Sequence, residues 1–226
     1  MSTSDDLLRT LRTWHKLPAR QLLERLGVSR ATLMRAVREL GPQIVARGLA
    51  RRTAYAARRM LRGNMQALPL YRIDSEGQSH EISSLFPVYP AGCALDFAEP
   101  IGWPLDQNMR DGWFEDLPYF LDDMRPQGFL GRHFAKHHAD LLQVSTDPNV
   151  WSEDDTLQAL TLLGSDQPGN YILGEPAMRQ WLADSQKDVT PLHDSQIEAV
   201  YLLKAEQAMT HGSAGSSAGG LATVHK

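Results

Sequence analysis

The sequence predicts an α+β fold, and three observations support this. With 226 residues, of which 42% are hydrophobic and 22% charged, the chain can bury one medium-sized core or two small ones. The residues up to Gln66 carry 14 Arg and Lys against four Asp and Glu, a net charge of +10, whereas the remainder carries −14. Helix-like and strand-like hydrophobic patterns both occur along the chain. We therefore expect two regions with different partners, and expect only the basic one to meet nucleic acid.

The basic region contains the pattern of two helices joined by a tight turn, in "PARQLLERLGVSRATLMRAVREL". Leu22, Leu23 and Leu26 form the apolar face of a first helix. Gly27 can adopt the positive φ of the turn, and Ser29 can cap the next helix. The spacing thus predicts a second helix that begins at the residue after Ser29.

The second helix has its apolar residues Leu33, Val37 and Leu40 at helical spacing, which places them on one inward face. Four polar residues remain largely on the other faces and are free to reach outward, namely Arg30, Thr32, Arg35 and Arg38. This pattern is typical of a helix-turn-helix with its recognition helix.

The stretch that follows, "QIVARGLARRTAYAARR", predicts two short strands around Arg47 and Gly48. Such a hairpin is a wing that carries Arg47, Arg51 and Arg52 toward a phosphate backbone. Residues 1–66 are therefore interpreted as a winged helix-turn-helix domain with duplex DNA as its partner. The alternative is a basic, solvated helical domain that binds a protein or nothing.

From about Ala67 the composition changes, and a small α/β layer is expected. The runs "LPLYRID" and "HEISSLFPVY" flank the turn-like "SEGQ" and predict a β-hairpin. Helices are expected around "FEDLPYFLDDM", around "GFLGRHFAKHHADLL", from Ser152 with Asp155 three residues on, and from Asp194 through Met209.

Sites with catalytic or metal chemistry are weakly supported in this second region. His133 and His137 lie four residues apart, but the Glu between paired histidines of a metalloprotease helix is absent, so surface or core histidines are favoured over a metal site. Helix N-terminal charge and solvated faces explain Asp122 with Asp123, and Glu153 to Asp155, better than magnesium does. No Ser-His-Asp or Cys-His arrangement follows from spacing. Four tryptophans are expected to pack in the core, namely Trp103, Trp113, Trp151 and Trp181.

The single cysteine, Cys93, excludes an internal disulfide, and no leader-like or long apolar run occurs in the sequence. A cytoplasmic location without membrane spans is expected.

Three segments resemble a known family when they are taken together and in order behind the helix-turn-helix. They are "LPYFLDDMRPQGFLGRHFA", "WSEDDTLQALTLLGSDQPGNYILG" and "GSSAGG". The chain up to Gly220 is similar to the N-terminal part of HipA-family toxins, in the YjjJ-like branch with a fused DNA-binding domain. The most specific pieces are "RPQGFLGR" at Arg125 to Arg132 and "GSDQPGNYILG" at Gly164 to Gly174.

The resemblance implies a Ser/Thr kinase relative with a small N-terminal subdomain ahead of an ATP-binding core, and antitoxins that bind operator DNA. It implies domains at 1–66, 67–174 and 175–226, the last being the helical lead-in and Gly/Ser-rich loop of the kinase core. By position Ser216 or Ser217 would match the autophosphorylated serine of that mobile loop. The loop glycines would be Gly215, Gly219 and Gly220.

The sequence departs from the family after this loop. The family continues with a lysine that meets the nucleotide phosphates, whereas this sequence reads "LATVHK", and Lys226 does not match that lysine. The later catalytic and magnesium-binding aspartates have no counterpart, so the interpretation is a truncated kinase core, inactive alone, with no cofactor where the complete family uses ATP and Mg.

Two functional hypotheses follow, ahead of a weaker third, a plain transcription factor with a small-ligand domain, for which no ligand-binding constellation is visible. One is a HipA/YjjJ-like toxin-lineage protein that retains DNA binding. The other is a non-enzymatic DNA-binding regulator, or an antitoxin-like partner of a separate HipA-type kinase. The partners to consider beside DNA are a kinase core, an antitoxin chain and a second copy of this chain.

Overall fold

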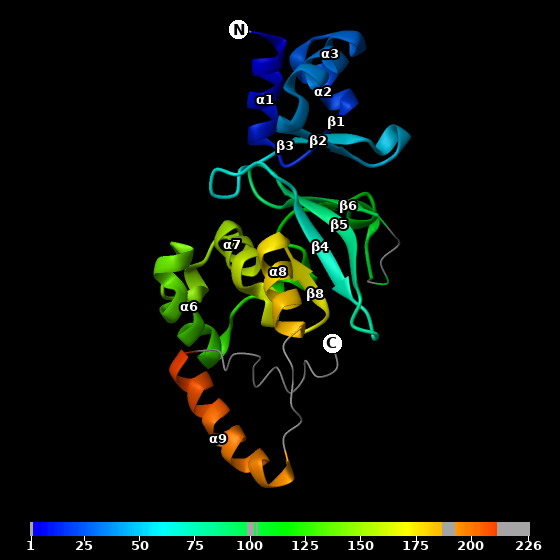
Figure 1. The fold of residues 1–226 in the computed structure, drawn as a ribbon. Coiled ribbons are helices and arrows are strands. Elements are labelled where there is room, and N and C mark those ends of the chain that lie inside the picture. The colour runs from blue at the N-terminus through cyan, green and yellow to red at the C-terminus, as the bar shows by residue number, and fades with distance from the viewer. Residues whose placement is uncertain (1, 99–101, 103, 187–192, 212–226) are drawn as a thin grey trace. The chain divides into compact units, whose positions relative to one another are not determined.

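A computed structural model describes residues 2–98, 102, 104–186 and 193–211, and it confirms a mixed α+β fold with antiparallel sheets (Figure 1). The chain divides into two compact units. The first comprises Met1–Leu68 and Ile82–Pro118, and the second comprises Pro69–Glu81 and Tyr119–Lys226. The first unit thus takes residues from both sides of the change in charge at Gln66.

The first unit begins with three helices and a three-stranded sheet (Figure 1). Their order is α1 (Thr3–Thr13), β1 (Leu17–Pro18), α2 (Ala19–Leu26), α3 (Arg30–Leu40), η1 (Gly41–Gln43), β2 (Ile44–Arg47), η2 (Ala50–Arg52) and β3 (Ala54–Ala57). The sheet is antiparallel in the order β1-β3-β2, with Tyr55 opposite both Leu17 and Ala46.

The predicted turn and caps between α2 and α3 are confirmed. Gly27 has φ 65° and its N–H donates to the Leu23 carbonyl, which ends α2 in the left-handed conformation that glycine tolerates best. The Ser29 side chain accepts a hydrogen bond from the Thr32 N–H, so α3 begins at the predicted residue. The predicted strand pair after α3 is likewise present as β2 and β3.

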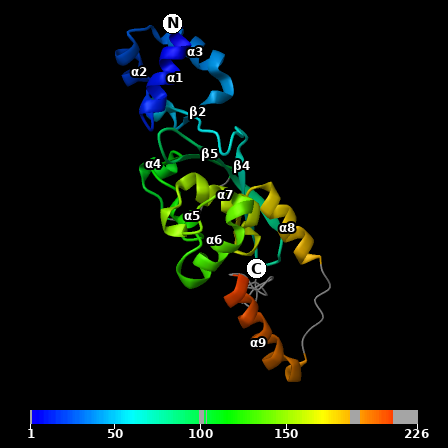
Figure 2. The same cartoon turned by 90° about the vertical axis from the view of Figure 1, so that its left-hand side faces the viewer.

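A leucine core joins the three helices, and Figure 2 shows them from a second side. Leu7, Leu11, Leu22 and Leu33 are fully buried in one cluster. Burial of such side chains contributes about 1.5–3 kcal/mol each to folding.

Strand β3 is buried on both faces. Tyr55 and Ala57 belong to the cluster under the helices, whereas Ala54 and Ala56 pack in a second cluster with Val45, Val88, Ala94 and Trp113. This assignment follows the two-residue period of a strand. Small side chains allow close packing on both sides, which explains the sequence "AYAA".

The second cluster is completed by later strands of the same unit. These are the last six residues of β5 (Ser79–Pro87), β6 (Cys93–Phe97) and β7 (Trp113–Phe114), with α4 (Gln107–Arg110) before β7. β6 pairs antiparallel with β5 and with β7. The helix expected around "FEDLPYFLDDM" is wrong over its first half: Phe114 pairs with Cys93, Pro118 follows in a non-helical stretch, and only α5 (Tyr119–Asp122) is helical.

The second unit contains β4 (Leu68–Ile73), of which all but the first residue lies in this unit, and β8 (Tyr171–Leu173), which pairs with β4 in antiparallel register. β4 and β5 are neighbours in the strand order β7-β6-β5-β4-β8, which confirms the predicted hairpin. The helices are α6 (Gly128–Leu142), η3 (Pro148–Val150), α7 (Glu153–Leu163), η4 (Gly164–Asp166), α8 (Glu175–Ser185) and α9 (Asp194–His211). Figures 1 and 2 label the four α-helices among them.

Three of these helices match sequence predictions. α6 occupies the whole predicted run, α7 begins after a Ser152 cap that forms a capping box with Asp155, and α9 covers the predicted Asp194 to Met209.

Candidate nucleic-acid interface

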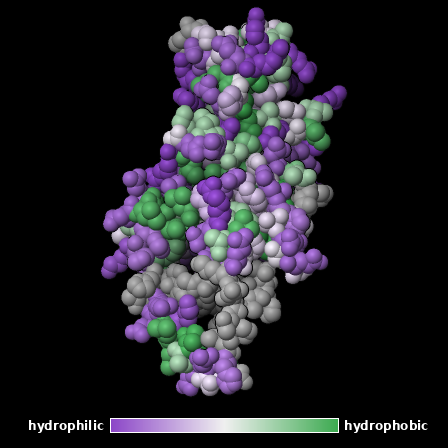
Figure 3. Space-filling model, in the orientation of Figure 1, coloured by the Kyte–Doolittle hydropathy of each residue, from purple (hydrophilic) through white to green (hydrophobic). Residues whose placement is uncertain are grey.

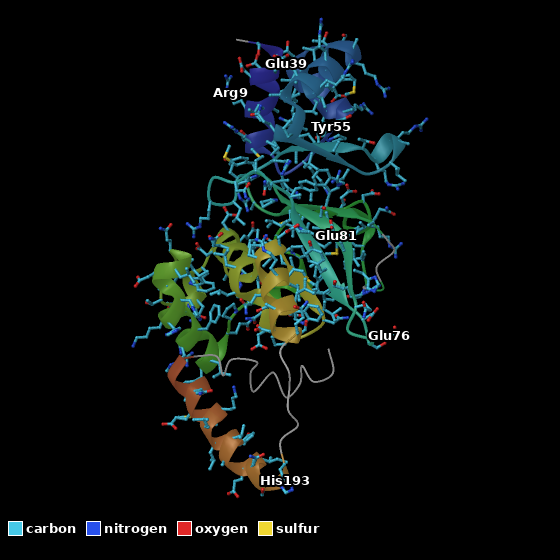
Figure 4. All side chains as sticks on the ribbon, viewed as in Figure 1. Arg9, Glu39, Tyr55, Glu76, Glu81 and His193 are labelled. Carbon is cyan, nitrogen blue, oxygen red and sulfur yellow. The ribbon has the colours of Figure 1, made fainter. Side chains whose placement is uncertain are left out.

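Helix α3 is held by its inward face and by its ends. The side chains of Leu33 and Leu40, on the inward face of the helix, are buried. Near its C-terminus, Glu39 accepts a hydrogen bond of 2.7 Å from the Ser4 hydroxyl of α1, and Figure 4 labels Glu39 beside that helix. The remaining faces of α3 are thereby fixed in orientation within the three-helix layer.

The exposed face of α3 carries the predicted cations. Arg30, Arg35 and Arg38 are all exposed. Within the part of the chain that the structure describes, Arg30 and Arg35 have no ion-pair or hydrogen-bond partner, and Arg38 donates from Nε only to the Met34 carbonyl at 3.3 Å. Thr32 is half-buried and its hydroxyl lies 3.0 Å from the Ser29 hydroxyl. Figure 3 shows that the surface over α1 to α3 is largely hydrophilic on the face in view.

Arg47, at the end of β2, is placed differently. Its Nε donates to the Leu95 carbonyl at 3.0 Å, its Nη2 lies 3.2 Å from Asp96, and its side chain is 19% exposed. The guanidinium also lies over the Phe86 ring at 5.1 Å from the centroid. Burial lowers the pKa of Arg47, while Asp96 acts in the opposite direction. Arg47 is therefore bound by its own unit.

Arg52 is also paired. Its Nε and Nη2 donate to the two carboxylate oxygens of Asp111 at 2.8 and 3.1 Å, the bidentate geometry that arginine favours. The Asp111 side chain is only 11% exposed, whereas that of Arg52 is 54% exposed. The hydrogen bond from Arg52 lowers the pKa of Asp111, and Gln107 and Lys16 contribute further lowering.

Arg51 completes the predicted set and resembles the α3 arginines. It is exposed and, among the described residues, has no ion-pair or hydrogen-bond partner. Of the seven residues predicted to contact DNA, four are exposed arginines without a carboxylate partner among the described residues. One is a half-buried threonine, and two are arginines paired with carboxylates.

Sequence reasoning missed the carboxylates that bind the turn between β2 and β3. Asp96 and Asp111 lie 49 and 59 residues beyond their partners, beyond the reach of any local pattern. The one available signal was the composition of 82–118, which has six acidic residues and one basic residue. Lys16 makes a related contact, donating to the Asn108 side-chain oxygen at 2.9 Å.

The histidines of α6 lie against rings. His133 is 4.4 Å from the Phe129 ring and His138 is 4.7 Å from the Phe134 ring, centroid to centroid. Burial lowers the pKa of His138, and the neighbouring His137 adds to this. Among the described residues no cluster of three or more His, Cys, Asp or Glu is arranged to hold a metal.

Of the tryptophans expected in the core, Trp113 and Trp151 are buried and Trp181 is partly buried against a cluster. Trp103 lies outside the described residues, as do the loop residues Gly215, Ser216, Ser217, Gly219 and Gly220.

Two segments with specific sequence patterns form close backbone contacts in the second unit. A Cβ on Gly131 would meet the Pro126 backbone at 2.4 Å, where "RPQGFLGR" enters α6. Gly174 has φ 84°, and a Cβ there would meet Thr161 Cγ2 at 2.5 Å, where "GSDQPGNYILG" leaves β8 for α8. Both glycines are required by packing.

The architecture defines an α+β protein with a basic three-helix layer and a larger region that follows it. Residues 64–182 match the family model described as the YjjJ-like toxin, middle domain. Because this match covers more than half of the chain, the protein belongs to the YjjJ-like toxin family.

A similar curated protein is Toxin YjjJ of Escherichia coli (strain K12), which is 34% identical over 203 residues. The aligned segment covers 89% of this chain and 43% of that relative, so the chain spans less than half of the relative's length. No solved structure matches. Over the described residues, no helix has both the length and the apolar character that a bilayer crossing requires.

Proposed function

We propose that the N-terminal part of this YjjJ-like protein is a winged helix-turn-helix that binds duplex DNA. The element order α1-β1-α2-α3-β2-β3 and the sheet order β1-β3-β2 support the assignment. In that assignment α3 is the helix that enters the major groove, and the turn between β2 and β3 is the wing.

The observation that carries the proposal is the set of unpaired arginines on α3. Arg30 and Arg35 are exposed on a helix whose opposite face is buried, and no described carboxylate neutralises them. Phosphates of DNA are the polyanion that such a surface favours, because each contact releases condensed counterions.

The test is fluorescence anisotropy of the whole chain with a labelled mixed-sequence duplex at several salt concentrations. Binding is expected to weaken steeply with salt. Arg30→Ala and Arg35→Ala are each expected to weaken binding several-fold and, where the lost contact is to phosphate, to make the salt slope shallower by about 1.

Arg132→Ala is the matched control, since it removes one exposed arginine from α6 in the other unit. It is expected to leave the affinity nearly unchanged. A wild-type chain that does not bind at low salt, or whose affinity is independent of salt, would refute DNA binding.

The relationship to HipA-type Ser/Thr kinases is part of this proposal for the whole protein. It rests on the segments at Arg125 to Arg132 and Gly164 to Gly174, which resemble that family. The E. coli relative is named as a toxin, which supports a toxin activity for the whole protein. Since the chain spans less than half of that relative, the kinase relationship and the toxin activity are both proposals.

A further inference from the structure

The turn between β2 and β3 has a tightly fixed backbone. A Cβ on Gly48, which has φ 88°, would lie 2.6 Å from the Arg52 carbonyl oxygen, so the two ends of the turn are in direct contact. The N–H groups of Arg52 and Thr53 donate to the carbonyls of Leu49 and Ala50, which forms the 3₁₀ turn η2. Ala50 adopts φ 52°, a conformation that alanine takes only where its surroundings hold it.

The same turn is attached to two segments of its own unit. Arg52 grips Asp111 with two hydrogen bonds. Arg47 reaches the Leu95 carbonyl and Asp96, and a Cβ on Gly112 would meet the Arg47 side chain at 3.4 Å. Gly112 therefore packs against Arg47 at the start of the turn, and its neighbour Asp111 binds Arg52 at the end of the turn.

The two adjacent arginines of η2 have opposite environments. In a 3₁₀ helix successive side chains point about 120° apart, so fixing one residue fixes the direction of the next. Arg52 is held on Asp111, whose side chain is nearly buried and would lose both hydrogen bonds from Arg52 if Arg52 moved to a phosphate. Arg51 is exposed, and no described residue pairs with it.

We infer that Asp111 is a positioning residue for DNA binding: by holding Arg52 it fixes η2 so that Arg51 projects outward as a phosphate contact. This inference rests on the proposed DNA-binding function. Arg52 is then a structural partner of Asp111 and not a DNA contact, and Asp111 favours DNA binding although it is acidic.

The inference can be tested by the sign of one effect. Asp111→Asn removes a negative charge, and on charge alone it should strengthen binding to a polyanion. Positioning predicts the reverse, namely an affinity reduced about threefold or more and a salt slope shallower by about 1, as the Arg51 contact is lost. Asp116→Asn, which removes an exposed carboxylate nearby in the sequence, is the matched control and should not weaken binding.

A double-mutant cycle separates positioning from a general effect on the fold. In the Arg51→Ala background, Asp111→Asn is expected to have no further effect on affinity. An equal loss in both backgrounds would overturn the inference, as would tighter binding by Asp111→Asn, which would mean that Asp111 competes with phosphate for Arg52.

A second variant, which keeps the net charge of the protein, tests the inference if Asp111→Asn does not fold. Arg52→Lys keeps the charge but removes the two-pronged hydrogen bonding, so it should weaken DNA binding at unchanged net charge. Unchanged affinity in Arg52→Lys would overturn the inference. Suppose that wild type binds DNA and that Arg35→Ala weakens this binding, whereas Arg52→Lys and Asp111→Asn do not. The positioning role of Asp111 then fails and the proposed function stands. If wild type does not bind DNA, the proposed function itself fails.

Discussion

Helix α3 and the segment from Arg47 to Arg52 at the turn between β2 and β3 each carry three arginines, but they present that charge in opposite ways. α3 has one buried face, and its arginines project from the others without carboxylate partners among the described residues. The turn leads into β3, which is buried on both faces, and two of the three arginines from Arg47 to Arg52 are neutralised by Asp96 and Asp111. The net charge of a sequence segment therefore overstates the charge that a ligand can meet.

The difference arises from topology. Residues 82–118 have six carboxylates and one arginine, and they pack in the same unit as the basic segment. Two of these carboxylates, those of Asp96 and Asp111, neutralise Arg47 and Arg52. We expect the salt dependence of DNA binding to reflect the unpaired arginines of α3 and Arg51 more than the full +10 of residues 1–66.

The largest effect is expected from breaking the turn itself. Gly48→Ala would place a Cβ 2.6 Å from the Arg52 carbonyl oxygen at φ 88°, so both a collision and backbone strain oppose it. We expect the free energy of unfolding to fall by about 1–3 kcal/mol or more in urea denaturation.

Gly63→Ala separates the backbone strain of such a substitution from the collision. Gly63 has a similar φ of 82° but nothing within 4 Å of an added Cβ. It should cost only the conformational part, about 1–2 kcal/mol. Equal losses in the two variants would show that the contact between Gly48 and Arg52 is not significant.

Helices α2 and α3 could be predicted because their signals are local, whereas α1 and α4 were not predicted. Gly27, Ser29 and Leu33 lie within seven residues, and each has the predicted role in the structure. The extent of α6 and the capping box of α7 were predicted from equally local patterns. The helix expected from Phe114 was wrong because pairing with β6, a tertiary contact, took Phe114 into a strand.

Which arginines of the candidate site are exposed and which are paired could be predicted only in part. Ser29 and the leucines of α3 determine which arginines of that helix face outward, and spacing alone gave this. The partners of Arg47 and Arg52 could not be predicted, because loop closure over 49 and 59 residues leaves no periodic trace in the sequence. The assignment of all seven residues to DNA stays a prediction.

A second way to sharpen the comparison uses the neighbouring arginines of the turn. Arg52→Ala would leave the nearly buried Asp111 without its bidentate partner, so we expect the thermal unfolding midpoint Tm to fall by a few degrees. Arg51→Ala removes the same charge from an exposed side chain and should leave Tm unchanged while weakening DNA binding. Similar Tm values for the two variants would remove the distinction between a bound and a free arginine.

The smallest effect is expected in the pH dependence of the same pair. Arg52 lowers the folded-state pKa of Asp111 below its ordinary value of 3.8. Such a group stabilises the fold above the unfolded-state pKa, and this stabilisation is lost as the pH falls through the folded-state pKa. The Tm difference between wild type and Asp111→Asn should therefore be constant from pH 7 to 5 and shrink below about pH 4.

Other carboxylates titrate in the same range, so the prediction concerns the difference between two variants. The Ser2 backbone N–H lowers the pKa of Asp5, and the His80 side chain lowers that of Asp74, but both effects are common to wild type and Asp111→Asn. Asp116→Asn, which changes an exposed carboxylate nearby in the sequence, is the control variant. A Tm difference for Asp111→Asn that persists unchanged at pH 3 would mean that packing around residue 111, and not its ion pair with Arg52, holds the turn in place.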